Sequence, residues 1–159
     1  MKVQLFRIDD RLIHGQVVIG WANFINSEKV VLCDDSVAEN DWEKELYLSS
    51  VPEYLTAIVL STDQMAEILK NETSDLSKTI VLVNSPFTVE KLVEKDSKPE
   101  EINVGGIHYK EGRREYLPYL FLNDLEVALF KKLMAQGIQF YCQDVPSAKR
   151  IPLQKVLSK

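Results

Sequence analysis

The feature that most limits the fold of this chain is a series of short apolar runs separated by segments of helical periodicity. Residues 29–33, 57–60 and 79–83 are the clearest of these runs, and runs of this length are typical of strands buried on both faces. The segments between them place apolar side chains at helical spacing. This alternation favours an α/β fold, in which a mainly parallel central sheet is covered by helices on both faces.

The apolar run at residues 3–8 overlaps a segment, residues 7–16, that holds two aspartates, two arginines and one of the two histidines. Apolar residues then fall on one helical face, and they are Val17, Val18, Trp21, Phe24 and Ile25. His14 is therefore expected at the point where a strand has ended and a helix begins.

The start of a helix after a strand suits an anion, because the first amide N–H groups lack partners inside the helix and the macrodipole places positive charge there. Arg11 adds a planar, permanently charged group that matches phosphate oxygens. The amides of Gly15 and Gln16 are expected to point at the same anion. His14 supplies a nitrogen that is uncharged and nucleophilic over much of the physiological pH range. Together these groups indicate transfer of a phosphoryl group to nitrogen, which depends mostly on positioning and charge stabilisation.

Three other charged residues of the segment have predicted roles. Asp10 either holds the tautomer of the His14 imidazole or caps the following helix, and the sequence favours neither alternative. Arg7 and Asp9 are expected to form a structural ion pair near the end of the first strand.

Several further elements are predicted from periodicity and end signals. A helix over residues 41–49 is expected to place Trp42 and Leu46 in the core. Asn123 begins a capping box with Glu126. The helix that follows is expected to bury Leu125, Ala128, Leu129 and Leu133.

The remaining segments complete the predicted order of elements. Residues 108–122 lack clear periodicity, and we expect a loop and a short strand there, antiparallel at an edge of the sheet. Residues 138–142 alternate as a half-exposed strand, and residues 153–157 are expected to form a short last helix.

Polar or glycine pairs follow three of the predicted strands. These pairs are Asp34 with Asp35, Asn84 with Ser85, and Gly105 with Gly106. Ligands of parallel sheets bind beyond the carboxyl ends of the strands. We therefore expect these pairs to meet His14 at one crevice.

Composition excludes several classes of protein. Twenty-four acidic against nineteen basic residues give a net charge of −5, without the basic surface of a nucleic-acid binder. The length suits a single domain over residues 1–159. No apolar run approaches the ~18 residues of a membrane span, and early charges leave no room for a signal peptide. The chain is expected in the cytoplasm, with Cys33 and Cys142 as reduced thiols.

The residue pattern gives weaker support to other kinds of functional site. Cys33 is either a phosphoacceptor thiol or, more in keeping with its type, a buried small hydrophobe. His108, Cys33 and the pair at 34–35 match no zinc spacing, so no metal and no cofactor are expected. The stretch from Gly15 to Gly20 lacks the Lys and Ser/Thr of a nucleotide P-loop.

The string RIDDRLIHGQVVIGW at residues 7–21 resembles the opening of the IIB components of the mannose/fructose/sorbose family of the bacterial sugar phosphotransferase system. The resemblance continues at residues 103–106, 109–112, 137–138 and 145–146, and so covers essentially the whole chain. It implies that His14 accepts a phosphoryl group, through its Nδ1 nitrogen, from a phosphorylated IIA protein or domain, with Arg11 supporting the phosphate.

The resemblance also implies partners. The phosphoryl group would pass to a hexose or amino sugar that enters through membrane IIC and IID components, with the chain peripherally associated with that transporter. Leu12 and Ile13 belong either to a surface that contacts these partners or to the core. The alternative function is a regulatory or anion-binding module of the same fold without turnover, and the sequence sets neither the sugar nor the oligomeric state.

Overall fold

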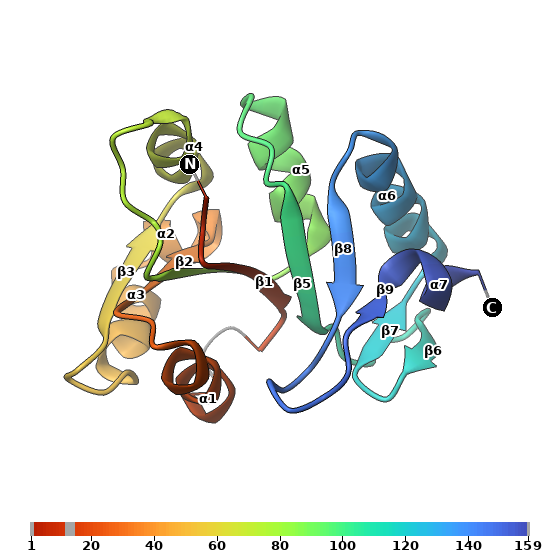
Figure 1. The fold of residues 1–159 in the computed structure, drawn as a ribbon, viewed down its shortest axis with the longest axis horizontal. Helices are drawn as coiled ribbons and strands as arrows, with labels where there is room; N and C mark the ends of the chain where they lie inside the picture. The colour runs from red at the N-terminus through yellow and green to blue at the C-terminus, as the bar shows by residue number, and fades with distance from the viewer. Residues whose placement is uncertain (1, 12–14, 159) are drawn as a thin grey trace.

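The computed structural model of the chain describes residues 2–11 and 15–158, with the side chains of residues 15–17 outside the description. The described strands form a seven-stranded central sheet in the order β3-β2-β4-β1-β5-β8-β9 (Figure 1). The strands of this sheet are β1 (Leu5–Asp9), β2 (Lys29–Cys33), β3 (Thr56–Leu60), β4 (Thr79–Val83), β5 (Glu101–Gly106), β8 (Gln139–Cys142) and β9 (Ile151–Pro152). The described pairs are parallel except β8 with β9, so the predicted fold class is confirmed.

Helices cover both faces of the sheet. In Figure 1, α1 and α3 lie on one side of the sheet and α4, α5 and α6 on the other. The bounds are α1 (Gly15–Ile25), α2 (Asp35–Glu39), α3 (Asp41–Ser49), α4 (Thr62–Lys70), α5 (Pro86–Glu94), α6 (Asp124–Ala135) and α7 (Leu153–Leu157). Two hydrophobic cores result, one under α1, α2 and α3 and one under α4, α5, α6 and α7.

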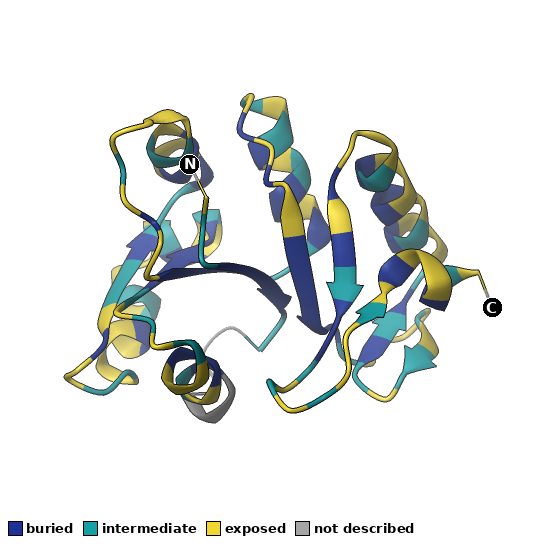
Figure 2. Cartoon of the chain, in the orientation of Figure 1, coloured by how far each residue is buried: buried dark blue, intermediate teal, exposed yellow. Residues whose placement is uncertain are grey.

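The central strands are buried on both faces, as their apolar runs predict. In β4, Ile80 and Leu82 belong to the core under α1, while Val81 and Val83 belong to the core under α5. This alternation follows from the two-residue period of a strand. Figure 2 shows the result as a band of buried residues through the middle of the sheet, with exposed residues on the outer sides of the helices.

The apolar faces predicted for helices α1, α3 and α6 are only partly buried. Phe24 of α1 and both Trp42 and Leu46 of α3 are exposed, and α3 instead buries Tyr47. Helix α3 contacts the edge strand β3, so little of its surface meets the sheet. Helical spacing identifies an apolar face, but the neighbouring elements decide which part of it is covered.

In α6 the buried face is rotated from the predicted one. Leu129 and Leu133 are buried as expected, whereas Leu125 and Ala128 are exposed and Glu126 and Phe130 are buried. The buried Glu126 carboxylate is compensated by an ion pair with Arg113 at 2.6 Å.

Residues 108–122 do not supply an edge strand of the central sheet. They form a separate antiparallel pair, β6 (Arg114–Leu117) and β7 (Leu120–Leu122). The antiparallel edge of the central sheet is β9, which follows a return of the chain beside β8. Helix α2 was not expected, and it begins because the Asp34 carboxylate accepts the Val37 N–H at 2.9 Å.

Candidate functional site

The carboxyl end of β1 lies at the middle of the sheet, between β4 and β5. Just beyond this end, the Asp10 N–H donates to the Gly106 carbonyl at 2.9 Å, which joins the end of β1 to the end of β5. The predicted meeting of the Gly105–Gly106 pair with His14 stays a prediction, although the neighbouring Asp10 does reach this pair. The position predicted for His14 lies outside the described residues.

Asp9 is a buried carboxylate that fixes Arg11. Its oxygens accept hydrogen bonds from the Arg11 main-chain N–H at 3.1 Å, Nε at 3.0 Å and Nη2 at 2.9 Å. Burial alone would raise the pKa of Asp9, but hydrogen bonds from Arg11 and the charge of Arg7 outweigh it, and the pKa lies below its ordinary value. Asp9 is therefore an anion that holds Arg11 in one orientation.

Arg7 is the second partner of Asp9 and is itself almost fully buried, at 1% exposure. Its Nη2 donates to Asp9 at 3.1 Å and to the Asp144 carbonyl at 2.9 Å. Its Nη1 donates to the Asn103 side chain and to the Gln143 carbonyl. The predicted Arg7–Asp9 pair is confirmed, and it also anchors the segment that follows β8.

Two further residues shape the surroundings of Arg7. The guanidinium lies 5.3 Å from the centre of the Trp21 ring of α1, within the range of a cation–π contact. A Cβ at position 105 would overlap the Arg7 guanidinium. Gly105 is therefore required because the β5 backbone approaches a buried side chain that has no room to move.

The Arg11 guanidinium is partly exposed and is bound by Asp9 through two of its three nitrogens. Asp9 takes Nε and Nη2, and among the described residues Nη1 has no hydrogen-bond partner. The side chain is 31% exposed. The hydrogen bond to Asp9 raises the pKa of Arg11, so its guanidinium is a permanent cation suited to a phosphate oxygen.

Asp10 binds the other histidine of the chain. Its Oδ2 accepts the His108 main-chain N–H at 2.7 Å, and its Oδ1 lies 2.6 Å from His108 Nδ1. The alternative in which Asp10 caps the start of helix α1 is not tested, because residues 12–14 lie outside the description. The other alternative, a role on the His14 tautomer, lies outside the described residues.

His108 is the site residue to which sequence reasoning gave no role. It follows the Gly105–Gly106 end of β5 by two positions, and a Cβ at Gly106 would lie 2.9 Å from His108 Cε1 and 3.2 Å from Arg11 Nη2. His108 and Arg11 therefore border the same point. The available sequence signal was the position of His108 in a loop at the carboxyl end of a central strand.

A brace from α6 holds the loop of His108. Arg113 Nη1 donates to the His108 carbonyl at 2.7 Å, while its Nε and Nη2 donate to Glu126 at 2.9 and 2.6 Å. Glu126 also accepts the Asn123 N–H in the capping box of α6. The predicted capping box is thus confirmed, and it also positions the His108 loop.

The other pairs predicted for the crevice have structural partners. Asp34 caps α2, Asp35 accepts from Thr62 at 2.7 Å and from Lys91 at 3.2 Å, and Asn84 accepts from Thr88 at 3.0 Å. These contacts stabilise the starts of the helices on the β2 and β4 side. Among the described residues, none of these side chains forms a hydrogen bond or an ion pair with Arg11 or His108.

Cys33 is fully buried, and its burial raises the pKa of the thiol to about 12. A thiol of this kind carries almost no thiolate at neutral pH. The alternative of a buried small hydrophobe is confirmed. Within residues 2–11 and 15–158, no cluster of three or more His, Cys, Asp or Glu side chains is arranged to hold a metal ion.

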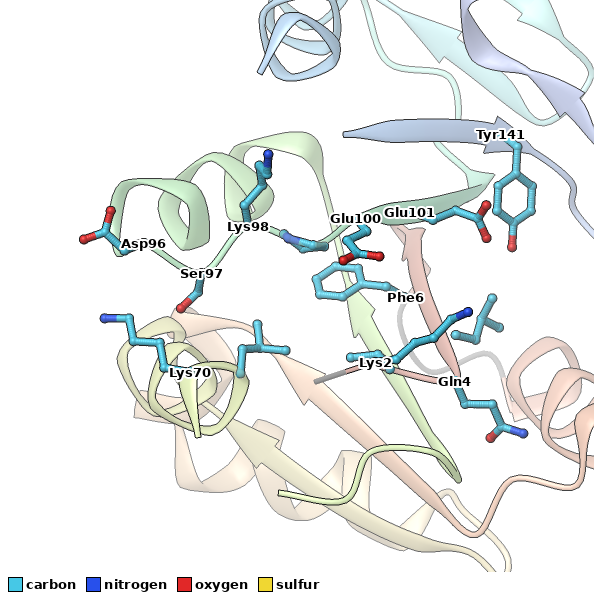
Figure 3. A pocket seen from close by; sticks show the side chains of 14 residues that line it. Lys2, Gln4, Phe6, Lys70, Asp96, Ser97, Lys98, Glu100, Glu101 and Tyr141 are labelled. Atoms are coloured by element: carbon cyan, nitrogen blue, oxygen red, sulfur yellow. The ribbon is translucent and has the colours of Figure 1, made fainter. Parts of the chain in front are cut away.

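A cavity of about 240 Å³ lies away from these residues, around the start of β1 (Figure 3). It is lined by side chains of both charges, among them Lys2, Lys98 and Glu100. The Lys98 ammonium already donates to the Gln136 carbonyl at 2.9 Å. The cavity lies at the amino ends of the parallel strands, whereas ligands of such sheets bind at the carboxyl ends, so we assign the candidate site to Arg11 and His108.

Comparison with known protein families supports an assignment. The family described as PTS system sorbose subfamily IIB component matches residues 3–159. The mannose-specific EIIAB component of Escherichia coli K12 is 31% identical over 159 residues, which is all of this chain and 49% of that protein. This chain thus spans about half the length of the mannose-specific relatives. The sorbose-specific EIIB component of Lacticaseibacillus casei is 27% identical over 159 residues, with 95% of that protein covered.

Solved structures share the fold. The N-acetylgalactosamine-specific IIB component 1 of Escherichia coli has a TM-score of 0.83 at 28% identity, over 94% of this chain and 98% of that one. The IIBSor domain of the sorbose permease from Klebsiella pneumoniae has a TM-score of 0.87 at 24% identity, over 99% and 97% of the two chains. None of the described helices has the length and apolar character needed to span a bilayer. Because the sorbose-subfamily IIB model matches residues 3–159, which is nearly the whole sequence, this chain belongs to the sorbose subfamily of phosphotransferase-system IIB components.

Proposed function

We propose that residues 1–159 act as one phosphocarrier domain. The domain accepts a phosphoryl group on His14 from a phosphorylated IIA protein or domain, and passes it to a sugar that enters through membrane IIC and IID components. The observation that carries this proposal is the position of Arg11, whose partly exposed guanidinium is held by buried Asp9 through Nε and Nη2, three residues before His14 in the sequence.

Each residue of the segment has a part in this function. Arg11 binds the phosphoryl oxygens and stabilises the charge that develops during transfer. Helix α1 begins at Gly15, so the first amides, those of Gly15 and Gln16, lack helical partners and suit an anion. In the first step the P–N bond of the IIA phosphohistidine breaks as a P–N bond to His14 forms. In the second step that bond breaks as a P–O bond to the sugar forms.

The sugar class is proposed from the relatives. Their names refer to mannose, sorbose and N-acetylgalactosamine, so a hexose or an amino sugar is proposed for this chain. The proposed steps need no cofactor, because the phosphoryl group arrives already activated on the partner.

Transfer of label tests the proposal directly. The chain is incubated with a IIA protein that carries a radiolabelled phosphohistidine, and acid-labile label on the chain is measured. We expect label on the wild type and on His108→Gln, and none on His14→Ala. Because the chain has only these two histidines, the two variants form a matched pair. Label that persists in His14→Ala, or that never reaches the wild type, contradicts the carrier function.

The same assay distinguishes the phosphocarrier from the alternative function. An anion-binding or regulatory module of this fold would bind inorganic phosphate through Arg11 and yet acquire no label. Phosphate binding measured by calorimetry, together with an absence of transfer, would favour that module.

The role of Arg11 is tested by its truncation. Arg11→Ala is expected to slow phosphoryl transfer about 100-fold, the usual loss when a donor to a developing charge is removed, while the far-ultraviolet circular dichroism spectrum stays unchanged. Arg114→Ala is the control, since Arg114 is exposed on β6. Equal transfer rates for the two variants would remove Arg11 from the mechanism.

A further inference from the structure

The Asp10–His108 pair has a geometry that fixes the tautomer of His108. A carboxylate only accepts hydrogen bonds, and its Oδ2 already receives the His108 main-chain N–H. The short contact of 2.6 Å between Oδ1 and Nδ1 therefore requires the proton on Nδ1. In the neutral ring, Nε2 then carries a lone pair, as in the Asp–His pairs of hydrolases.

The ring is held at more than one point. Asp10 is tied to the end of β5 through the Gly106 carbonyl, and Arg113 ties the His108 carbonyl to Glu126 of α6. The side chain of His108 is nevertheless 40% exposed. Among the described residues Nε2 has no hydrogen-bond partner, so this nitrogen of the oriented, partly exposed ring keeps its lone pair.

This nitrogen belongs to the same site as Arg11. The point above Gly106 is within contact distance of both His108 Cε1 and Arg11 Nη2, and Cε1 is bonded to Nε2 in the ring. His108 therefore lies beside Arg11, the residue proposed to bind the phosphoryl group. The charged groups around the ring are Asp10, Arg11 and Arg113. The charge of Arg113 is neutralised by its ion pair with Glu126.

We infer that His108, oriented by Asp10, is the general base that removes the proton of the sugar hydroxyl. This inference rests on the proposed function and concerns only its second step. As the P–N bond to His14 breaks and the P–O bond forms, the hydroxyl proton moves to Nε2 of His108. His14 leaves as neutral imidazole when its other nitrogen carries a proton, and His108 later releases its proton to water. The first step needs no such base, because the attacking imidazole nitrogen has a free lone pair.

The two steps can be measured separately on the full chain. The first is label transfer from phosphorylated IIA to the chain. The second is loss of that label to sugar in membrane vesicles that contain the matching IIC and IID components, with mannose, fructose, sorbose and N-acetylgalactosamine tested in turn. His108→Gln is expected to accept label at the wild-type rate and to transfer it to sugar about 100-fold more slowly, as for loss of a general base.

Two further variants separate a base from a structural role. Asp10→Asn keeps an acceptor oxygen but loses the charge that orients the ring, so it should slow the second step less than His108→Gln and leave the first unchanged. Tyr109→Phe changes the exposed neighbour of His108 and should leave both steps unchanged. A solvent deuterium isotope effect on the second step that disappears in His108→Gln would support proton transfer to this ring.

The outcomes distinguish this inference from the proposed function. If the wild type never acquires label, the proposed function and this inference fail together. If label is acquired and His108→Gln transfers it to sugar at the wild-type rate, only the general base is refuted. Equal slowing of both steps in His108→Gln also refutes it, because a base for the hydroxyl acts in the second step alone.

Discussion

Two consecutive aspartates at the end of β1 have opposite environments. Asp9, the last residue of the strand, is buried and is shared by the guanidinium groups of Arg7 and Arg11. Asp10, the next residue, is partly exposed and holds the imidazole of His108. The first carboxylate belongs to a buried arginine cluster, formed by Arg7, Asp9 and Arg11, and the second to a partly exposed histidine pair, formed by Asp10 and His108.

The two environments imply different contributions of Asp9 and Asp10 to the stability of the fold. A buried charge must be paired, because removing its partner leaves an uncompensated ion in a medium of low dielectric constant. A partly exposed pair is screened by water and contributes little to stability. The cluster can therefore hold Arg11 in place, while the fold depends less on the charges of the histidine pair.

The largest expected effect comes from breaking the arginine cluster. Arg7→Met leaves Asp9 with one partner in a buried position and also removes the anchors at Gln143 and Asp144. We expect the free energy of unfolding to fall by about 3–5 kcal/mol, measured by urea denaturation. Arg114→Met, at an exposed arginine, should change it by less than about 0.5 kcal/mol. Similar losses for the two variants would show that burial of Arg7 is not what makes it costly to remove.

Asp9→Asn tests the same cluster through pH. At pH 7 the loss is expected to be about 2–3 kcal/mol, the range for a hydrogen bond to a charged group. The pKa of Asp9 is lowered in the folded chain, so its ionised form stabilises the fold above the unfolded-state pKa of about 3.9. This contribution is lost as pH falls through the folded-state pKa.

The measurement is the difference in unfolding free energy between wild type and Asp9→Asn as pH is lowered from 7 toward 3. That difference should shrink on the acidic side. Other carboxyl groups with lowered pKa values, such as Asp35, contribute equally to the unfolding free energy of both proteins, so their contributions cancel in the difference. A difference that stays constant with pH would mean that the charge of Asp9 is not what stabilises the cluster.

Glycine substitutions test the space around the cluster. Gly105→Ala places a Cβ on the Arg7 guanidinium, and such overpacking of a filled interior costs about 1–3 kcal/mol. Gly20→Ala is the matched control, because a Cβ there meets nothing within 4 Å on a helix, where alanine is favoured by roughly 0.5–1 kcal/mol. The two variants should shift the denaturation midpoint in opposite directions. A shift in the same direction would show that Arg7 can move aside.

The elements of this fold were largely predictable, because they depend on local signals. The strands at 29–33 and 79–83 and the short helix at 153–157 have the predicted bounds. The capping box of Asn123 and Glu126 is also present. These features follow from the spacing of apolar residues and from the residue types at the ends of each element, and both signals lie within a few residues.

The inward faces of the helices were not predictable in the same way. Trp42 and Leu125 have the right spacing for a core position and are exposed, because the rotation of a helix is set by neighbours far along the chain. Glu126 illustrates the point, since its burial depends on Arg113.

The site was predictable only in part, for the same reason. Arg11 and its segment stand out in sequence, and the buried pairing of Arg7 with Asp9 is local. The partner of Asp10 is 98 positions away, and no local pattern connects the two residues. The roles predicted for His14, Gly15 and Gln16 remain predictions.

The smallest expected effect on stability comes from the histidine pair. Asp10→Asn keeps an oxygen that accepts the His108 main-chain N–H and loses a charge that is partly exposed to water, so the free energy of unfolding should fall by less than about 1 kcal/mol. Asp9→Asn is the comparison, since the two substitutions change the same atoms at adjacent positions. If Asp10→Asn costs as much as Asp9→Asn, the histidine pair is a structural brace like the arginine cluster. A small cost would instead mean that Asp10 is free to serve the orientation of His108, because the fold does not depend on its charge.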